Sequence, residues 1–298
     1  MDNLIIRNAA GTAKTVSDVR TLCNSAVNEI TLGSMTWLPR SGNQGTTTGF
    51  NERESAYTNA LGLPNMGFEK YMEVLFYIAT TAQCKNKKLV ASVAGFSPQE
   101  YTDMALGCYQ RGVDLVEFNF GCPNVWGDGG RKPIPSYDPE LARDILQHAA
   151  PMLRSIGQRV SVKISPVKDD RVLAELADVM LESNIVCEIV GCNTIPDQDL
   201  LLEDGTHALS FMTDGDDTVK HVGGLSGKPL YTESLAIAGM LRTWLPNSIR
   251  VVAAGGIFTG TDAQGYLDKG AAGFECAAAL MVYGPKIFGD IAQELANM

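Results

Sequence analysis

The chain has 298 residues, of which 45% are hydrophobic and 19% charged, and its formal net charge is −10. A negative balance of this size argues against nucleic acid or an anionic membrane surface as the main partner, although it leaves room for a local basic pocket. No run reaches the roughly eighteen apolar residues of a membrane span, and the N-terminus is too short and polar for a secretory signal, so we expect a cytoplasmic protein.

The cysteines and histidines give no pattern of a metal site. The seven cysteines are odd in number and irregularly spaced, and they form no C-x-x-C pair. We therefore expect reduced thiols rather than a disulfide framework. The three histidines show no ligand spacing, and we expect no metal.

Short β-branched runs alternate with longer amphipathic segments along most of the chain. The runs predict strands at residues 4–6, 29–32, 89–93, 115–119, 160–164, 188–191, 250–254 and 273–276. The amphipathic segments predict helices at residues 16–27, 68–82, 98–111, 139–156, 172–183, 234–245 and 263–269. Alternation of this kind predicts a parallel sheet, and eight strands in a chain of this length favour a closed (β/α)8 barrel. We expect one α/β domain over residues 1–298, a TIM barrel with loops inserted on its C-terminal face.

Two polar loops interrupt the alternation. One covers residues 124–138, and the other, which is long and acidic, covers residues 196–222. Both follow the C-terminal ends of predicted strands, where barrels of this class carry their active sites. We therefore expect lids or substrate loops rather than inert insertions.

The most informative stretch reads Val-Glu-Phe-Asn-Phe-Gly-Cys-Pro-Asn over residues 116–124. A buried cysteine is often only a small apolar filler. Cys122 differs because the proline after it ends the strand and leaves the thiol at the mouth of the barrel. A thiolate there can remove a proton or attack a carbon, so we predict a catalytic role for Cys122.

Three turns of small residues follow late strands, at residues 223–229, 251–257 and 275–278. Glycines can simply permit tight turns. After the last strands of a barrel, however, small residues let backbone N–H groups converge on a phosphate, helped by a short helix N-terminus. The sequence therefore predicts a phosphate site at these turns.

Three further polar residues each allow two interpretations. Lys163 lies near the end of a predicted strand; a lysine inside a barrel is costly unless it meets an anion or takes part in chemistry, whereas an outward lysine is simply solvated. Lys14, in a loop, has the same two interpretations. Asn59 opens the loop at residues 59–65, where it either forms a turn or pairs with a planar heterocycle.

Taken together, these motifs resemble the dihydroorotate dehydrogenase family and, more distantly, the pyrimidine-reducing domain of dihydropyrimidine dehydrogenase. The likeness extends from residue 8 to about residue 284 and rests on residues 8–11, 59–65, 119–124, 193–194, 223–229 and 255–257. That family is a (β/α)8 barrel that holds FMN at the C-terminal ends of its strands. The resemblance therefore implies a barrel enzyme with FMN as its cofactor.

The residues resemble two branches of this family at once. Cys122 is similar to the base of the soluble class 1 enzymes, whereas class 2 enzymes use serine. Gly33 stands where class 1 has a lysine, and Lys14 stands where class 2 supplies its substrate lysine. The resemblance thus implies a class 1 base combined with a class 2 cation.

The resemblance also implies a role for each residue that matches a family motif. It implies catalytic roles for Cys122 and Lys163. The isoalloxazine or its ribityl chain would be contacted by Ala10, Gly11, Ser34, Asn119 and Lys163, and the FMN phosphate by Gly227, Gly256, Ala277 and Ala278. The pyrimidine would be bound by Lys14, Asn59, Asn124, Asn193 and Thr194, with Lys14 near its carboxylate. The family commonly has threonine at the position of Ala278, so this chain would offer only backbone N–H groups there.

The activity that the resemblance implies is oxidation of dihydroorotate to orotate in pyrimidine biosynthesis. Cys122 would take the proton from C5 while hydride passes from C6 to flavin N5. Three alternatives stay open: an FMN enzyme acting on another dihydropyrimidine, a flavin-free barrel lyase with Lys163 as Schiff base, and a non-catalytic ligand-binding barrel. The resemblance further implies a homodimer and an electron acceptor that could be fumarate, a nicotinamide-linked partner subunit, a quinone or oxygen.

Overall fold

The computed structural model describes residues 4–80, 84, 86–127 and 130–298. Its centre is a closed ring of eight parallel strands in the order β1-β17-β16-β11-β10-β7-β6-β2, which β1 closes by pairing with β2. The bounds of these strands are β1 (Ile5–Asn8), β2 (Glu29–Met35), β6 (Lys88–Val93), β7 (Leu115–Asn119), β10 (Val160–Ile164), β11 (Val186–Gly191), β16 (Arg250–Ala254) and β17 (Gly273–Cys276). The prediction of a (β/α)8 barrel is confirmed, and β7, β10, β16 and β17 have the predicted bounds.

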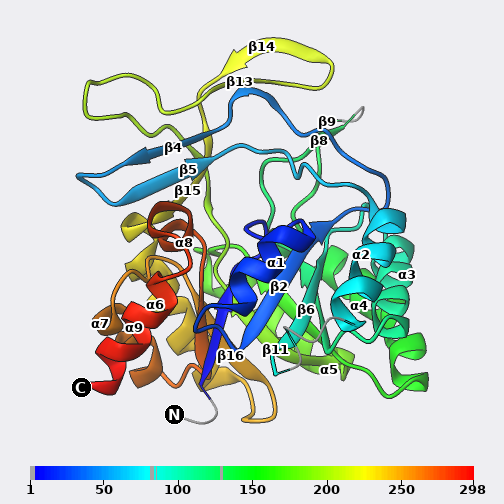
Figure 1. Ribbon diagram of the computed structural model, residues 1–298. Coiled ribbons are helices and arrows are strands. Elements are labelled where there is room, and N and C mark those ends of the chain that lie inside the picture. Colours follow the sequence, from blue (N-terminus) through cyan, green and yellow to red (C-terminus); the bar gives the residue numbers. More distant parts are fainter. Residues whose placement is uncertain (1–3, 81–83, 85, 128–129) are drawn as a thin grey trace.

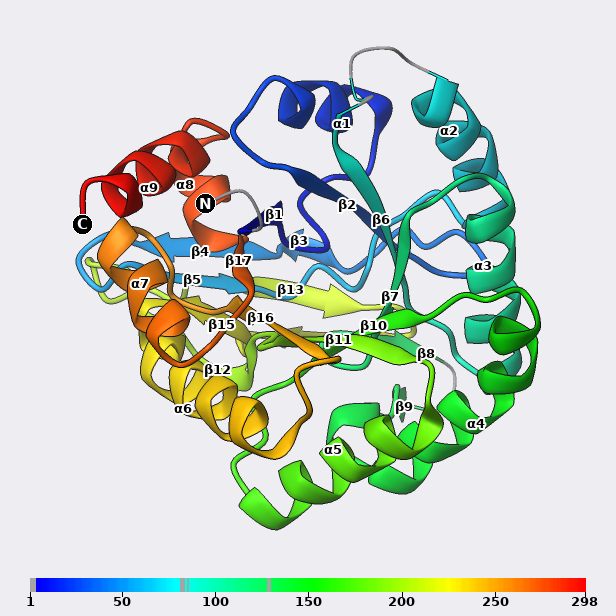
Figure 2. The ribbon, with the colours of Figure 1, turned by 90° about the horizontal axis from the view of Figure 1, so that it is seen from below.

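Helices surround the ring (Figure 2). They are α1 (Val16–Cys23), α2 (Phe68–Thr80), α3 (Pro98–Gln110), α4 (Pro139–Ser155), α5 (Asp170–Ser183), α6 (Lys228–Trp244), α7 (Gly260–Asp268), α8 (Ala278–Tyr283) and α9 (Ile287–Ala296). The helix predicted at 16–27 is too long, because Asn24 caps α1 with its backbone N–H and a turn follows. The sequence analysis did not predict α8 and α9. No helix in the described part of the chain is long and apolar enough to cross a membrane.

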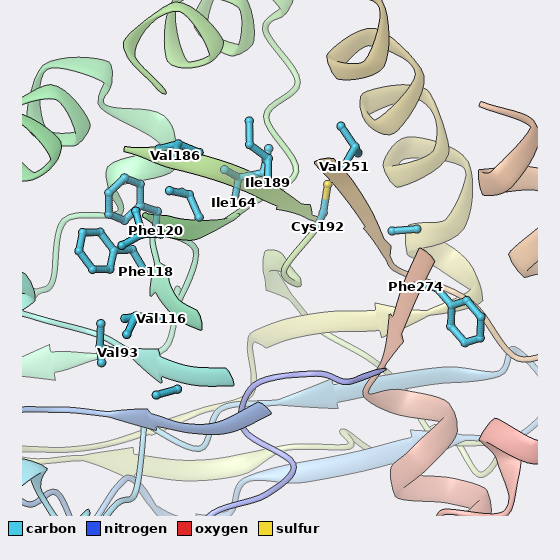
Figure 3. Packing of buried hydrophobic residues seen from close by; sticks show 14 of the residues in the cluster. Val93, Val116, Phe118, Phe120, Ile164, Val186, Ile189, Cys192, Val251 and Phe274 are labelled. Atoms are coloured by element: carbon cyan, nitrogen blue, oxygen red, sulfur yellow. The ribbon is translucent and has the colours of Figure 1, made fainter. Parts of the chain in front are cut away.

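Alternation along β7 shows how one strand serves both the core and the barrel interior. Val116 and Phe118 point outward into the layer between strands and helices (Figure 3). The Tyr101 ring of α3 packs there, with its centroid 5.1 Å from that of Phe118. Glu117 and Asn119, at the intervening positions, are buried on the opposite face. The outer face of the ring therefore anchors the helices and leaves its inner face free for polar groups.

Two small antiparallel sheets cover the end of the barrel at which its strands terminate (Figure 1). One has the order β12-β15-β5-β4 and the other β14-β13-β3. Their strands are β3 (Gln44–Thr46), β4 (Thr48–Asn51), β5 (Ala56–Asn59), β12 (Ile195–Gln198), β13 (Ser210–Thr213), β14 (Asp216–Lys220) and β15 (Gly223–Gly227). The segment 196–222, expected to be a loop, thus contains most of β12 and all of β13 and β14. Periodicity did not indicate this, because the pairing joins segments far apart in sequence, such as β15 with β5.

The loop after β7 contains a short pair of strands, β8 (Trp126–Gly127) and β9 (Gly130–Arg131), and a turn of 3₁₀ helix at Pro135–Tyr137. Residues 128 and 129 of the predicted loop lie outside the described residues. The loop returns to the barrel through Ser136, whose side-chain hydroxyl donates to the Phe120 carbonyl at 2.8 Å. Its ends are therefore fixed to the barrel.

The expectation that all thiols are reduced is wrong for two of them. Cys23, the last residue of α1, and Cys84, beyond the end of α2, form a disulfide with a Cα–Cα distance of 5.4 Å. That separation is ordinary for a disulfide. The 61-residue separation hid the pair, because only folding brings the ends of the two helices together. The other five cysteines, including Cys122, are free.

Candidate active site

A single pocket opens at the C-terminal ends of the barrel strands, beneath the two small sheets. The space within it and its mouth measures about 1140 Å³. All of the predicted site residues line it, namely Ala10, Gly11, Lys14, Ser34, Asn59, Asn119, Cys122, Asn124, Lys163, Asn193, Thr194, Gly227, Gly256, Ala277 and Ala278. The fold thus brings together residues from both ends of the chain in one pocket.

Cys122 lies just beyond the end of β7, and its thiol is partly exposed in the pocket. Burial raises the pKa of this thiol above its ordinary value, and a hydrogen bond from the Asn124 backbone and the charge of Lys132 offset only part of the effect. The free site therefore holds Cys122 mainly as a thiol at neutral pH. Its deprotonation must be linked to pH or to ligand binding.

Four asparagines line the pocket together with the cysteine, and they form two hydrogen-bonded pairs. The Asn124 amide donates to the Asn59 carbonyl at 2.7 Å, and the Asn193 amide lies 3.4 Å from the Asn119 side-chain oxygen. Asn119 in turn donates to the Ser34 hydroxyl at 2.9 Å. These bonds fix the orientation of the carboxamides, whose remaining donors and acceptors suit the edge of a planar polar ring.

Thr194 adds an unused hydroxyl to the same pocket. Its Oγ1 is buried and has no hydrogen-bond partner within the described part of the chain. Its backbone N–H is already bound to the Asn193 side chain at 2.8 Å. A buried hydroxyl without a partner is costly, so a ligand in the pocket would supply what the protein lacks.

Lys14 enters the pocket from the loop before α1. Thr15 and Asp18 form a capping box there, and the Asp18 carboxylate also accepts from the Lys14 backbone at 2.9 Å, which fixes the base of the lysine. Burial lowers the pKa of the Lys14 ammonium, whereas Cys122 and Asp18 raise it in part. Lys14 is therefore a partly desolvated cation close to Cys122 and suited to an anionic group.

Lys163 points into the barrel, so the solvated alternative is wrong. It is buried, and its ammonium is paired with the Glu275 carboxylate across the barrel interior. Burial alone would lower the pKa of Lys163, but the carboxylates of Glu275 and Glu117 outweigh it and raise the pKa above its ordinary value. Lys163 is thus held as an ammonium at the floor of the pocket.

The turns of small residues also line the pocket, and two of them pack so closely against neighbouring protein atoms that only glycine fits. Gly227 has φ +88°, and a Cβ on it would lie 2.2 Å from the Ser55 carbonyl oxygen. Gly256 has φ +70°, and a Cβ would lie 2.6 Å from the Tyr231 Cβ. Helix α8 starts at Ala278 with no side-chain cap, which leaves its first N–H groups available. Close backbone approach and uncapped N–H groups are the chemistry that binds phosphate.

Among the residues in or beside the pocket that were not predicted from the sequence, Tyr57, Glu275 and Lys132 bear on its chemistry. Tyr57 and Glu275 line the pocket. Lys132 lies beside it, with its ammonium 5.7 Å from the Tyr101 ring centroid and influencing the pKa of Cys122. Inward alternation on β17 could have indicated Glu275, and the basic pair in the loop after Cys122 could have indicated Lys132. Tyr57 gave no such signal, since β5 itself was not predicted. In the described ranges, no group of His, Cys, Asp and Glu could hold a metal ion.

Comparisons with known proteins identify the family of the chain. The family model described as dihydroorotate dehydrogenase matches residues 2–298. A dihydroorotate dehydrogenase (fumarate) of Trypanosoma cruzi is 29% identical over 300 residues, which cover 98% of this chain and 88% of the relative. The catalytic subunit of dihydroorotate dehydrogenase B (NAD(+)) of Methanocaldococcus jannaschii is 23% identical over 284 residues, 95% of this chain and 85% of the relative. The fold matches the crystal structure of the Eimeria tenella enzyme in complex with ferulenol with a TM-score of 0.82 and 20% identity, covering 98% of this chain and 80% of that one.

Proposed function

The chain belongs to the dihydroorotate dehydrogenase family, an oxidoreductase family acting on CH–CH groups, and we propose that it oxidises dihydroorotate to orotate with bound FMN. We take residues 1–298 as one FMN-binding domain. The observation that carries the proposal is that Cys122, Lys14, Lys163 and the four asparagines line the same pocket as the glycine turns. A base, a cation for a carboxylate, amides for a ring and a phosphate cradle are the groups that this reaction needs.

The pocket is compatible with FMN at both of its ends. Gly227, Gly256, Ala277 and Ala278 would hold the phosphate, since all four line the pocket and none carries a side chain larger than a methyl group. At the barrel floor, Lys163 would offer its ammonium to the isoalloxazine, and Ala10, Gly11, Ser34 and Asn119 would contact the ring or ribityl chain. Bound FMN would supply the hydride acceptor, which none of the twenty ordinary side chains can provide.

The residues of the chain would do the rest of the chemistry. Cys122 would accept the proton from C5 of dihydroorotate and release it to solvent after turnover. Asn59, Asn124, Asn193 and Thr194 would hold the pyrimidine so that this proton faces the sulfur, which is catalysis by orientation. Lys14 would pair with the substrate carboxylate and so favour dihydroorotate over an uncharged ring.

The alternative with Lys163 as a Schiff-base nucleophile receives no support. Such a lysine must be neutral to attack a carbonyl, and neutrality is reached by a lowered pKa. Here the pKa of Lys163 is raised, because burial lowers it less than the carboxylates of Glu275 and Glu117 raise it. The pairing instead favours a permanent electrostatic role.

The family also supports proposals about assembly. We propose a homodimer. We also propose that it passes its electrons to a separate acceptor, in line with relatives whose names give fumarate and NAD(+). Light scattering of the purified protein would measure the dimer, with a monomeric mass at micromolar concentration contradicting it.

One anaerobic titration tests the proposed substrate. The purified protein should be yellow, with close to one flavin per chain, and dihydroorotate should bleach it stoichiometrically. Dihydrouracil, which lacks the carboxylate, should bleach it far more slowly. Equal bleaching by both would support another dihydropyrimidine as substrate, and a colourless protein that refuses added FMN would overturn the proposal.

A further inference from the structure

The barrel interior beneath the pocket contains a chain of buried charges. Barrels of this class are usually filled by branched aliphatic side chains. Here a small apolar cluster of Ile5, Val190, Val252 and Ala254 shares the interior with charged side chains. Arg7, fully buried on β1, contacts three carboxylates at once. Its partners are Glu29 at 3.1 Å, Glu188 at 2.9 Å and Glu275 at 3.3 Å. Charges at this depth need good partners, because desolvation is expensive.

Among the three carboxylates that contact Arg7, only that of Glu275 belongs to a residue lining the pocket. It lines the pocket wall, while Glu29 and Glu188 do not. One of its oxygens accepts from the Lys163 ammonium and the other from the Arg7 guanidinium. Glu275 therefore connects the charge network of the barrel to the one buried lysine at the pocket floor.

The partners of the two cations differ in number. Arg7 keeps Glu29 and Glu188 if Glu275 is removed. Lys163, by contrast, donates a single hydrogen bond within the described part of the chain, and its acceptor is Glu275. Glu275 therefore determines where the Lys163 ammonium lies, and it contributes less to holding Arg7.

The pair also changes the electrostatic potential in the pocket. An isolated ammonium in a poorly hydrated site would strongly favour extra negative charge on a neighbouring group, because the local dielectric constant is low. A carboxylate in contact with that ammonium cancels most of its field. The neighbouring Glu117, whose pKa burial and Glu275 raise to about 7, adds further negative charge when it is ionised.

From this geometry we propose that Glu275 is a positioning residue that fixes the Lys163 ammonium at the pocket floor and sets the bound flavin to a more negative reduction potential than Lys163 alone would give. This inference rests on the proposed FMN site. Reduction adds negative charge to the flavin, so a carboxylate beside the pocket opposes it. Removing that carboxylate while keeping Lys163 must make reduction easier.

The test compares midpoint potentials of the bound flavin in Glu275→Gln and in the matched control Glu29→Gln. Both variants remove one carboxylate from Arg7, but only Glu275 lines the pocket. We expect Glu275→Gln to favour two-electron reduction at least tenfold, a positive shift of about 30 mV or more. Glu29→Gln should stay close to the wild type. An unchanged potential in Glu275→Gln, or an equal shift in both variants, would overturn the inference.

A double variant covers the case in which Glu275→Gln does not fold. Arg7→Gln with Glu275→Gln removes one charge of each sign, and Glu29 and Glu188 keep Lys88 and Arg250 as partners. The midpoint potential of the flavin should still shift in the positive direction, but less than in Glu275→Gln, because Glu275 is closer to the pocket than Arg7 is. A shift to a more negative potential would contradict the proposal. Wild-type protein without flavin would instead count against the proposed function, so the two failures are distinguishable.

Discussion

Lys132 returns from the loop after β7 to lie near Cys122, and each group alters the pKa of the other. Burial lowers the pKa of Lys132 to about 8, although Cys122 and Glu100 raise it in part. Its ammonium also lies 5.5 Å from the Phe96 ring centroid. The loop thus places a partly desolvated cation beside the proposed base.

The first prediction concerns pH. A base must lose its own proton before it can accept one from substrate, and burial raises the pKa of Cys122. The rate of flavin reduction by dihydroorotate should therefore rise with pH above neutrality, with its midpoint above the ordinary cysteine pKa of about 8.5. Stopped-flow measurements between pH 6 and 10 would show this. A rate that is already maximal at pH 6 would contradict it.

The second prediction is that Lys132 favours the thiolate form of Cys122. Lys132→Met removes a charge that favours the thiolate, so alkylation of Cys122 by iodoacetamide at pH 7.5, followed by peptide mass spectrometry, should slow several-fold. Lys132→Arg should stay near the wild-type rate because it keeps the charge. Equal rates in Lys132→Met and the wild type would show that the cation does not act on the thiol.

Lys14 should determine recognition of the substrate carboxylate. A hydrogen bond between charged groups is worth about 1.5–3 kcal/mol, so Lys14→Met should raise KM for dihydroorotate by about tenfold or more. Dihydrouracil kinetics should change little. Lys286→Met, at an exposed lysine just before α9 and outside the pocket lining, serves as the control. An equal rise in KM for dihydroorotate and dihydrouracil would show that Lys14 does not bind the carboxylate.

The phosphate turn should be intolerant of a methyl group. Gly256→Ala would place a Cβ 2.6 Å from the Tyr231 Cβ at φ +70°. FMN affinity, measured by fluorescence quenching on apoprotein, should fall at least tenfold, or about 1.4 kcal/mol. Gly205→Ala is the matched control, because its φ is +83° and nothing lies within 4 Å of its Cβ. Comparable FMN binding in both variants would mean that this turn does not hold the phosphate.

The Cys23–Cys84 disulfide should stabilise the fold without touching the pocket. It closes a long loop, for which about 2–4 kcal/mol is typical. The double variant Cys23→Ser, Cys84→Ser should melt at a lower temperature, and dithiothreitol should lower the melting temperature of the wild type but not of the variant. An identical response of both proteins to the reductant would contradict the disulfide.

The barrel could be predicted from the sequence because alternation of strands and helices is a local pattern, whereas most of the pocket residues were implied by the family resemblance. Alternation on β10 restricts Lys163 to one of two faces of the strand, and Pro123 follows Cys122 directly in the sequence. Even so, the decision between an inward and an outward Lys163 needed the structure, since only folding brings Glu275 opposite it.

Features built from distant segments could not be predicted in this way. The β5–β15 pairing, which forms the roof of the pocket, joins residues 56–59 to 224–227 and leaves no periodic signal in either segment. The Cys23–Cys84 bond has the same origin. The raised pKa of Cys122 depends on burial, which spacing alone does not reveal.

The most direct test of the central claim is the single-turnover rate of flavin reduction by dihydroorotate in Cys122→Ala. Removing a general base typically costs about 10²–10⁴-fold in rate. We predict that this variant keeps a full complement of FMN and is reduced at least about a hundredfold more slowly than the wild type, with Cys122→Ser between the two. Reduction of Cys122→Ala at the wild-type rate would contradict the assignment of Cys122 as the base.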